Sequence, residues 1–320
     1  MFDNVHHAGS KTLSMNSLNV LIGHSLNPDT RTAVREVIDA IAQPDICLTL
    51  LFTSPEHDLE LLAPILQSQL SGPILGCTTA GEDSALRGHA TGSIVAVSVA
   101  SPHLIAHPHV ITPLDSMTQE SAKAIAAGLH ERRRLPDGEC FSLLLIDGMS
   151  MLEETTTAFL HANLRVPLVG GSAGDNLQFG KTFVYWEGEF INNAAVVCLV
   201  ETTLPFTHFR SQHIVPTSER LVVTEADPSN RRVMEIDGEI ASVAYAELLG
   251  IAVEDLSPAV FSKHPIMLRL GGEFYVRSIQ RVEADGSLVF YCAVDNGIVL
   301  TVGEGADLTG NLAKTLSEVE

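Results

Sequence analysis

Two glycine-rich segments carry the residues best suited to binding a ligand. The first runs from Pro73 to Glu82 and the second from Pro167 to Asp175. Each reads proline, two apolar residues, glycine, small residues with a hydroxyl, then Ala-Gly and an acid, a pattern typical of a buried strand that ends in a glycine turn. Backbone N–H groups freed by glycine, together with hydroxyls, can hold a carboxylate or another anion. The repeated pattern predicts a site built from two matching turns.

The predicted binding residues are the small, hydroxyl-bearing and acidic members of these turns: Cys77, Thr78, Thr79, Gly81, Glu82, Gly171, Ser172, Gly174 and Asp175. The two acids repel an anion unless they are turned away, but they can hold an ammonium group, so a free amino acid is a sensible ligand. A simpler interpretation is that the glycines only close tight turns and that the acids cap the elements that follow.

The segments around the turns repeat as well. A helix-like stretch at 31–42 precedes an apolar run at 47–52, and 119–133 precedes 140–146 in the same way. Ser54-Pro55 and Ser150-x-x-Glu153 are typical of helix starts. Further strands are expected at 92–100 and 193–200. Two copies of helix–strand–helix–strand–turn–strand predict two similar α/β units whose turns face one another.

Beyond about residue 202 the pattern changes to short strands, a helix at 240–250 that ends on a glycine, and a helix at 307–320 that stops without glycine or proline. That last feature favours a chain that continues in the natural protein. The predicted strands are 208–215, 220–225, 232–236, 266–270, 273–279, 287–294 and 298–302, with hairpin signals such as Asn296-Gly297 between the later ones. The predicted fold class is therefore α/β with α+β: a mobile N-terminus at 1–17, duplicated units at 18–202, and a mostly antiparallel sheet with helices at 203–320.

Composition limits the classes of function. The chain has 320 residues, 45% of them apolar, which is enough for two domains. Five cysteines without a CxxC pair favour a reducing, cytoplasmic compartment. No apolar run approaches the ~20 residues of a membrane helix. A formal charge of −20 makes nucleic acid an unsuitable partner.

Several motifs that recur in order resemble the FIST family of bacterial sensory domains. They are Gly76-Cys-Thr-Thr-Ala-Gly-Glu82, Gly170-Gly-Ser-Ala-Gly-Asp175, the strand at 193–199, Ser211-Gln-His-Ile-Val-Pro216 leading to Val222-Val-Thr224, and Tyr275-Val-Arg277. The resemblance covers nearly the whole chain and implies a small-ligand sensor without enzymatic activity that acts on a signalling protein. Family members usually carry a further C-terminal strand–helix segment, which does not follow Glu320 here.

The version Ser211-Gln-His213 is most similar to a branch of the family that binds haem, senses nitric oxide and acts on a histidine kinase. The resemblance therefore implies haem with His213 as its axial ligand, since a neutral imidazole suits the iron. His89, His24 and His208 are lower alternatives, and the general expectation for any histidine is a surface or hydrogen-bonded core role. Arg277, on an otherwise apolar strand, is a further ligand-binding candidate whose simpler role is an ion pair.

Two other functions remain as alternatives. The first is a receptor for an amino acid or a similar small metabolite. The second is a cysteine-dependent hydrolase or transferase that uses Cys77, because a thiol in a glycine turn near helix N-termini can have a lowered pKa. No histidine lies near Cys77 in the sequence to serve as its base. Neither GxGxxG nor GxxxxGK[ST] follows a strand, so the usual phosphate-binding loops are missing.

Overall fold

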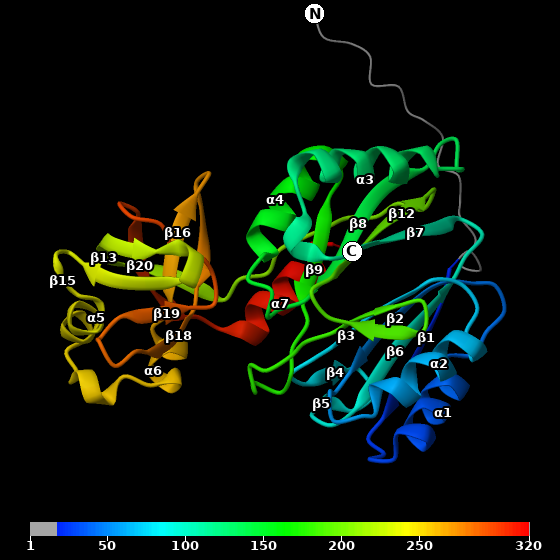
Figure 1. Cartoon of the computed structure of the whole chain (residues 1–320), viewed down its shortest axis with the longest axis horizontal. Coiled ribbons are helices and arrows are strands. Elements are labelled where there is room, and N and C mark those ends of the chain that lie inside the picture. The colour runs from blue at the N-terminus through cyan, green and yellow to red at the C-terminus, as the bar shows by residue number, and fades with distance from the viewer. Residues whose placement is uncertain (1–17, 320) are drawn as a thin grey trace, which may run out of the picture. The chain divides into compact units, whose positions relative to one another are not determined.

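A computed structural model describes residues 18–319, and the chain divides into a unit of residues 1–206 and a unit of residues 207–320. The mobile N-terminus predicted at 1–17 lies outside the described residues. The elements of the first unit (Figure 1) are β1 (Asn19–Ser25), α1 (Thr30–Ile41), β2 (Ile46–Thr53), α2 (Leu59–Gln69), β3 (Ile74–Thr78), β4 (Glu82–Ser84), β5 (Gly88–Ala90), β6 (Ile94–Ala100), β7 (Leu104–Ile111), α3 (Gln119–Glu131), β8 (Glu139–Ile146), α4 (Glu153–Leu164), β9 (Leu168–Ser172), β10 (Val184–Trp186), β11 (Glu189–Ile191) and β12 (Ala195–Thr202).

Two sheets of the first unit have the same strand order. One runs β1-β6-β2-β3 and continues into β10-β11, and the other runs β7-β12-β8-β9. In each sheet the last two strands of the shared order pair in parallel and the others are antiparallel. The predicted duplication is therefore confirmed, with β1, β6, β2 and β3 equivalent to β7, β12, β8 and β9.

Matching backbone hydrogen bonds fix the equivalence of individual residues. Thr79 N donates to Thr53 O at 3.0 Å, and Ala173 N donates to Ile146 O at 2.7 Å. Both bonds tie the residue after a strand's end to the last residue of the neighbouring parallel strand. Thr79 is therefore equivalent to Ala173, and Thr78 to Ser172, which ends β9.

Hydrophobic burial divides the first unit into four layers, helix, sheet, sheet and helix. Helices α1 and α2 cover the outer face of the first sheet, and α3 and α4 cover the outer face of the second (Figure 1). Between the sheets lies a third apolar cluster, to which both contribute, with Leu75 and Cys77 from one and Leu145 and Val196 from the other. Strands β3 and β12 are buried along their whole length, and β2, β6 and β8 along most of theirs, which explains the long apolar runs in the sequence.

The two repeats differ in their hairpins. Hairpin β10–β11 follows the second glycine turn but pairs with β3 of the first sheet. Its counterpart β4–β5 follows the first turn and forms a two-stranded sheet of its own. Residues 175–183 connect the second turn to β10, whereas Gly81 alone separates Ala80 from β4. The hairpin of the second repeat therefore has enough chain to reach the other sheet.

Two predicted helix starts are wrong. Helix α2 begins after Asp58, whose carboxylate accepts a hydrogen bond from Leu61 N at 3.0 Å, and not at Ser54-Pro55. Ser54 N instead donates to Ser93 O, which extends the sheet. Helix α4 has Leu152 as its N-cap with no side-chain hydrogen bond to the cap, so no capping box forms at Ser150.

The second unit is built on an eight-stranded sheet in which all pairings are antiparallel. Its core gathers apolar side chains from the sheet and from the helices packed on it, among them Tyr245 and Phe261. Its elements are β13 (Ile214–Asp227), β14 (Arg232–Ile236), β15 (Glu239–Ile240), α5 (Ala241–Leu249), α6 (Pro258–Lys263), β16 (Ile266–Leu270), β17 (Glu273–Arg277), β18 (Ile279–Val282), β19 (Leu288–Phe290), β20 (Val299–Gly305) and α7 (Leu308–Ser317).

Most strands of this unit lie where the sequence predicts them. The strand predicted at 208–215 is wrong, because β13 begins only at Ile214 and residues 205–213 are irregular, and β15 and β18 were not predicted. The helix predicted at 240–250 is α5, and Gly250 ends it in the left-handed conformation (φ 68°). The predicted fold class, α/β with α+β, is confirmed.

Packing of β9 against β8 depends on one of two adjacent glycines. A Cβ added to Gly170 would lie 1.9 Å from Leu144 O, closer than any real contact. A Cβ added to Gly171 would meet nothing within 4 Å. Neither glycine has a positive φ, so the two positions differ only in the room available for a side chain.

We predict that Gly170→Ala lowers the free energy of unfolding by about 3 kcal/mol, because the added methyl group must push β9 away from β8. Gly171→Ala is the matched control, and we expect it to change stability by less than about 0.5 kcal/mol. Urea unfolding followed by circular dichroism measures both. Equal stability of the two variants would contradict the packing described here.

Candidate functional site

The two glycine turns lie against each other. Gly174 N donates to Thr78 O at 2.8 Å, which joins the turn of the second repeat to the end of β3. A Cβ added to Gly174 would lie 2.8 Å from Ala80 N, so the second turn needs a residue without a side chain at this point. The predicted proximity of the two turns is confirmed.

The hydroxyls of the first turn are engaged within the protein. Thr78 N donates to Phe183 O at 2.9 Å, and Phe183 N donates back to Thr78 Oγ1 at 3.0 Å. Thr79 Oγ1 donates to the carboxylate of Glu82. These bonds hold β10 on the end of β3.

Glu82 is a buried acid, 2% exposed, that is held by hydroxyl and amide donors. Besides Thr79, Ser93 donates to it through Oγ at 2.7 Å and through its backbone N at 3.3 Å. Burial lowers the pKa of His57 and of His24, with a further lowering of the His24 pKa by the charge of Arg87, and the negative charge of Glu82 opposes this only in part. The Nε2 atoms of both histidines are buried without a hydrogen-bond partner.

Asp175, at the end of the second turn, closes the loop that leads to β10. It is 7% exposed, and its carboxylate accepts from Phe179 N at 3.0 Å, Gly180 N at 2.6 Å and Lys181 N at 3.2 Å. Gly171 and Ser172, two other predicted binding residues, are exposed on β9. Asp175 thus caps backbone N–H groups, the role that the simpler interpretation assigns to it.

Asp147, which sequence analysis does not single out, has a similar role after β8. It is 5% exposed and accepts from Met149 N at 2.9 Å, Asn193 N at 2.6 Å and the hydroxyl of Thr182. Because Thr182 directly precedes Phe183, Asp147 anchors the start of the crossing hairpin to the second sheet. An acid after an apolar strand run was the only signal in the sequence.

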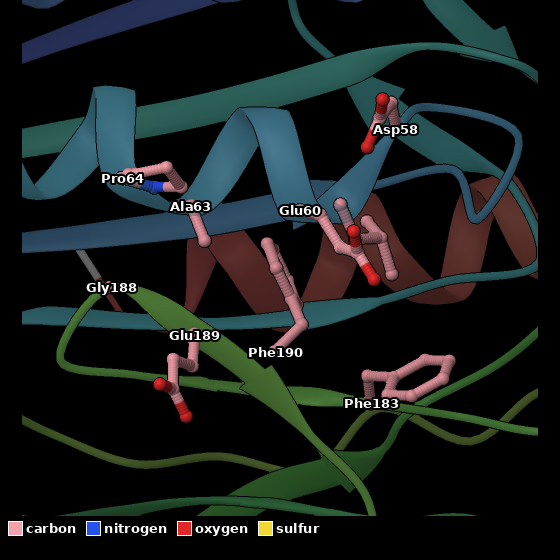
Figure 2. Close-up of a pocket in the computed structure, with 9 residues that line it drawn as sticks. Asp58, Glu60, Ala63, Pro64, Phe183, Gly188, Glu189 and Phe190 are labelled. Carbon is pink, nitrogen blue, oxygen red and sulfur yellow. The ribbon is translucent and has the colours of Figure 1, made fainter.

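A cavity of about 670 Å³ opens between the first half of α2 and the β10–β11 hairpin (Figure 2). Pockets of this size hold small organic molecules. In Figure 2 the ring of Phe190 stands between hairpin and helix, and Glu60 extends from the helix. The lining residues are Asp58, Leu59, Glu60, Ala63, Pro64, Phe183, Gly188, Glu189 and Phe190.

The cavity combines negative charge with aromatic walls. Asp58 caps α2, but no hydrogen bond or ion pair joins the side-chain carboxylate of Glu60 or Glu189 to any residue that the structure describes. None of the described residues that line the cavity is basic. Two phenyl rings, of Phe183 and Phe190, form apolar walls, and Phe190 is fixed by an edge-on contact with Tyr185 at 5.5 Å between ring centres.

The cavity is connected to the glycine turns through Phe183. Phe183 lines the cavity. Its carbonyl accepts from Thr78 N, its N–H donates to Thr78 Oγ1, and the carbonyl of Thr78 accepts from Gly174 N. Phe183 therefore links the wall of the cavity to the contact between the two repeats. Sequence analysis missed the cavity because α2 and the hairpin belong to different repeats.

His213 and Arg277 lie in the second unit. His213 is half-buried just ahead of β13; its carbonyl accepts from Ala306 N at 2.6 Å, and its ring has no hydrogen bond to any described residue. Arg277 ends β17, and its buried Nε has no hydrogen-bond partner. The ion pair considered for Arg277 is not formed with any residue between 18 and 319.

The described residues contain no group of three or more histidine, cysteine or acidic side chains able to hold a metal ion. None of the described helices has the length and apolar character needed to cross a membrane.

Cys77 is 2% exposed within the core between the sheets. Burial, with a smaller effect from the charge of Glu82, raises the pKa of Cys77 to about 12, so at neutral pH the group is a thiol and not the reactive thiolate.

We predict that Cys77 resists thiol reagents in the native protein, because its sulfur is both buried and protonated. Mass spectrometry after brief treatment with iodoacetamide at pH 8 should find Cys47 labelled well before Cys77, since Cys47 is only half-buried. Both cysteines should react in urea. Rapid native labelling of Cys77 would instead support the cysteine-dependent enzyme.

Comparison with known proteins identifies the family. Residues 47–239 match the FIST N domain and residues 241–320 match the FIST C domain. The chain is also similar to the uncharacterized protein MJ1623 of Methanocaldococcus jannaschii, with 27% identity over 152 residues, 43% of this chain and 29% of that protein. The chain thus spans under a third of the length of this relative. FIST domains are sensory domains that bind small ligands, and this chain belongs to the FIST family.

Proposed function

We propose that this FIST protein senses a small organic molecule that carries a positively charged amine, such as an amino acid or a related metabolite, and reports it to a signalling protein. The cavity between α2 and the β10–β11 hairpin carries this proposal. Its volume of about 670 Å³ suits such a molecule, and the charged residues among its described lining are all acids, namely Asp58, Glu60 and Glu189.

The chemistry of the walls favours a cation over an anion. Carboxylates attract an ammonium group, and the faces of phenyl rings attract cations within about 6 Å. A carboxylate ligand without an amine would meet only like charges. Because Glu60 and Glu189 are exposed and screened by water, we expect modest affinity that weakens as salt increases.

We predict that agmatine and arginine bind to the purified protein and that succinate, a dicarboxylate of comparable reach, does not. The double variant Glu60→Gln/Glu189→Gln should lower the affinity for agmatine about tenfold, since each exposed carboxylate contributes up to about 1 kcal/mol. Isothermal titration calorimetry at low salt measures both.

Glu120→Gln is the matched control, because Glu120 also occupies the first turn of a helix and is exposed, but lies in α3 away from the cavity. It should leave agmatine binding unchanged. Binding of succinate in preference to both amines, or equal binding by the double variant and the native protein, would contradict the proposed ligand class.

A second proposal concerns haem, with nitric oxide as the signal and a histidine kinase as the output. The cavity beside α2 does not fit haem, because it offers no histidine or cysteine and its acids would face the haem propionates. The second unit offers better residues: the unpartnered imidazole of His213 for the iron and the guanidinium of Arg277 for a propionate. Haem would supply the iron that binds nitric oxide.

We predict a Soret band on adding haem to the protein and its loss in His213→Ala, because the axial ligand holds the iron most directly. His208→Ala is the control, since His208 belongs to the same irregular segment but is exposed. If His208→Ala loses the band and His213→Ala keeps it, the axial assignment is wrong. If no band forms with the unmodified chain, the haem proposal itself fails.

A further inference from the structure

Strand β9 leaves one edge of the second sheet open. The sheet ends at β9, which pairs with β8 on one side and with no other strand among the described residues. Val169, Gly170, Gly171 and Ser172 are all exposed, Val169 by 44%. Exposed edges in native proteins are commonly protected by charged side chains or proline, and none of these four residues is either.

The register shows which groups the open edge presents. Ala173 N donates to Ile146 O, and Ser142 N donates to Pro167 O, so the odd-numbered residues direct their backbone groups towards β8. Gly170 and Ser172 therefore direct theirs away from β8, to the open side. An incoming strand would find two residues with unpaired N–H and C=O groups.

The equivalent edge in the first repeat is already occupied. Gly76 and Thr78 of β3 correspond to Gly170 and Ser172 of β9, and they pair with β10, which runs antiparallel to β3. Thr78 uses both its N–H and its hydroxyl oxygen to bind Phe183. Ser172 offers the same two groups at the same position.

A difference in chain length explains why only β3 is covered. The hairpin on β3 comes from the other repeat through residues 175–183, whereas β4–β5 is tethered to its turn by Gly81 alone. The hairpin that symmetry would place on β9 is therefore held elsewhere, and the site that it would fill stays available.

We propose that the open edge of β9 binds a β-hairpin of a partner protein in the way that β3 binds β10. The hairpin adds its first strand antiparallel to β9, and the residue opposite Ser172 both accepts from the Ser172 N–H and donates to its hydroxyl. The interaction surface goes beyond the ligand proposals and does not depend on which ligand binds.

The occupant of β3 indicates the chemistry of this partner strand. It carries Phe183, Val184 and Tyr185, which are uncharged and aromatic or β-branched. The four exposed residues of β9 are uncharged as well, so no charged partner residue is required there. Main-chain hydrogen bonds would supply affinity, and apolar side chains would supply specificity.

The chain's own hairpin is a suitable probe. A cyclised peptide with the sequence of residues 182–192 is titrated into the full-length, ¹⁵N-labelled protein, and amide signals are followed by NMR. We expect the amides of Gly170 and Ser172 to shift, and their hydrogen exchange to slow. The same peptide methylated on the backbone nitrogens of its Phe183 and Tyr185 positions is the control, because it keeps the side chains but loses the inward N–H groups.

Variants of adjacent residues test the hydrogen bonds. Ser172→Pro removes the outward N–H and should weaken peptide binding about tenfold, and Ser172→Ala removes only the hydroxyl and should weaken it about threefold. Gly171→Ala, whose N–H faces β8, should bind as the native protein does. The alanine variants keep the test valid if Ser172→Pro does not fold.

Three results would overturn the proposal. One is an absence of shifts at Gly170 and Ser172 at millimolar peptide. Another is equal binding of the methylated peptide. The last is a shift of these amides with protein concentration alone, which would show that β9 pairs with a second copy of the chain and not with a different protein.

Discussion

The approach of two backbones at the glycine turns is the constraint on which the first unit depends. Gly174 N reaches Thr78 O because no side chain separates the second turn from Ala80. This contact sets the ends of the two sheets side by side and lets their inner faces share one apolar cluster. A side chain between the turns would separate the sheets and expose that cluster. The cluster between the sheets is therefore complete only when both repeats are in place.

The same constraint determines how polar groups near the turns are used. Where backbones pack this closely, water is excluded, and buried polar atoms must find partners within the protein. Glu82 and Asp175 therefore accept hydrogen bonds from neighbouring hydroxyl and amide groups. The acids whose carboxylates remain free for a ligand are Glu60 and Glu189, which line the cavity and have no side-chain partner in the described structure. The glycine turns hold the hairpin that forms one wall of the cavity, but none of their own residues lines it.

Local patterns predicted the local structure well. The duplication, the meeting of the turns and the end of α5 at Gly250 follow from residue types that impose a backbone shape. The helix start at Ser54 was wrong because Ser54 N bonds to Ser93 O across the sheet, and the start at Ser150 was wrong because Ser150 closes a turn with Asp147. The cavity could not be predicted, since nothing in a short sequence window shows that β10 crosses to the sheet of the other repeat. The strand order that creates the site is set by the length of residues 175–183, not by a motif.

That crossing also has a consequence for synthesis on the ribosome. Thr78 and Phe183 are 105 residues apart in the chain, yet they are direct hydrogen-bond partners. Until the hairpin has left the exit tunnel, the β3 edge and part of the apolar cluster therefore remain uncovered. At about 5–20 residues per second this interval lasts on the order of ten seconds. During it, the nascent chain exposes a strand edge of the kind that chaperones and neighbouring nascent chains can bind.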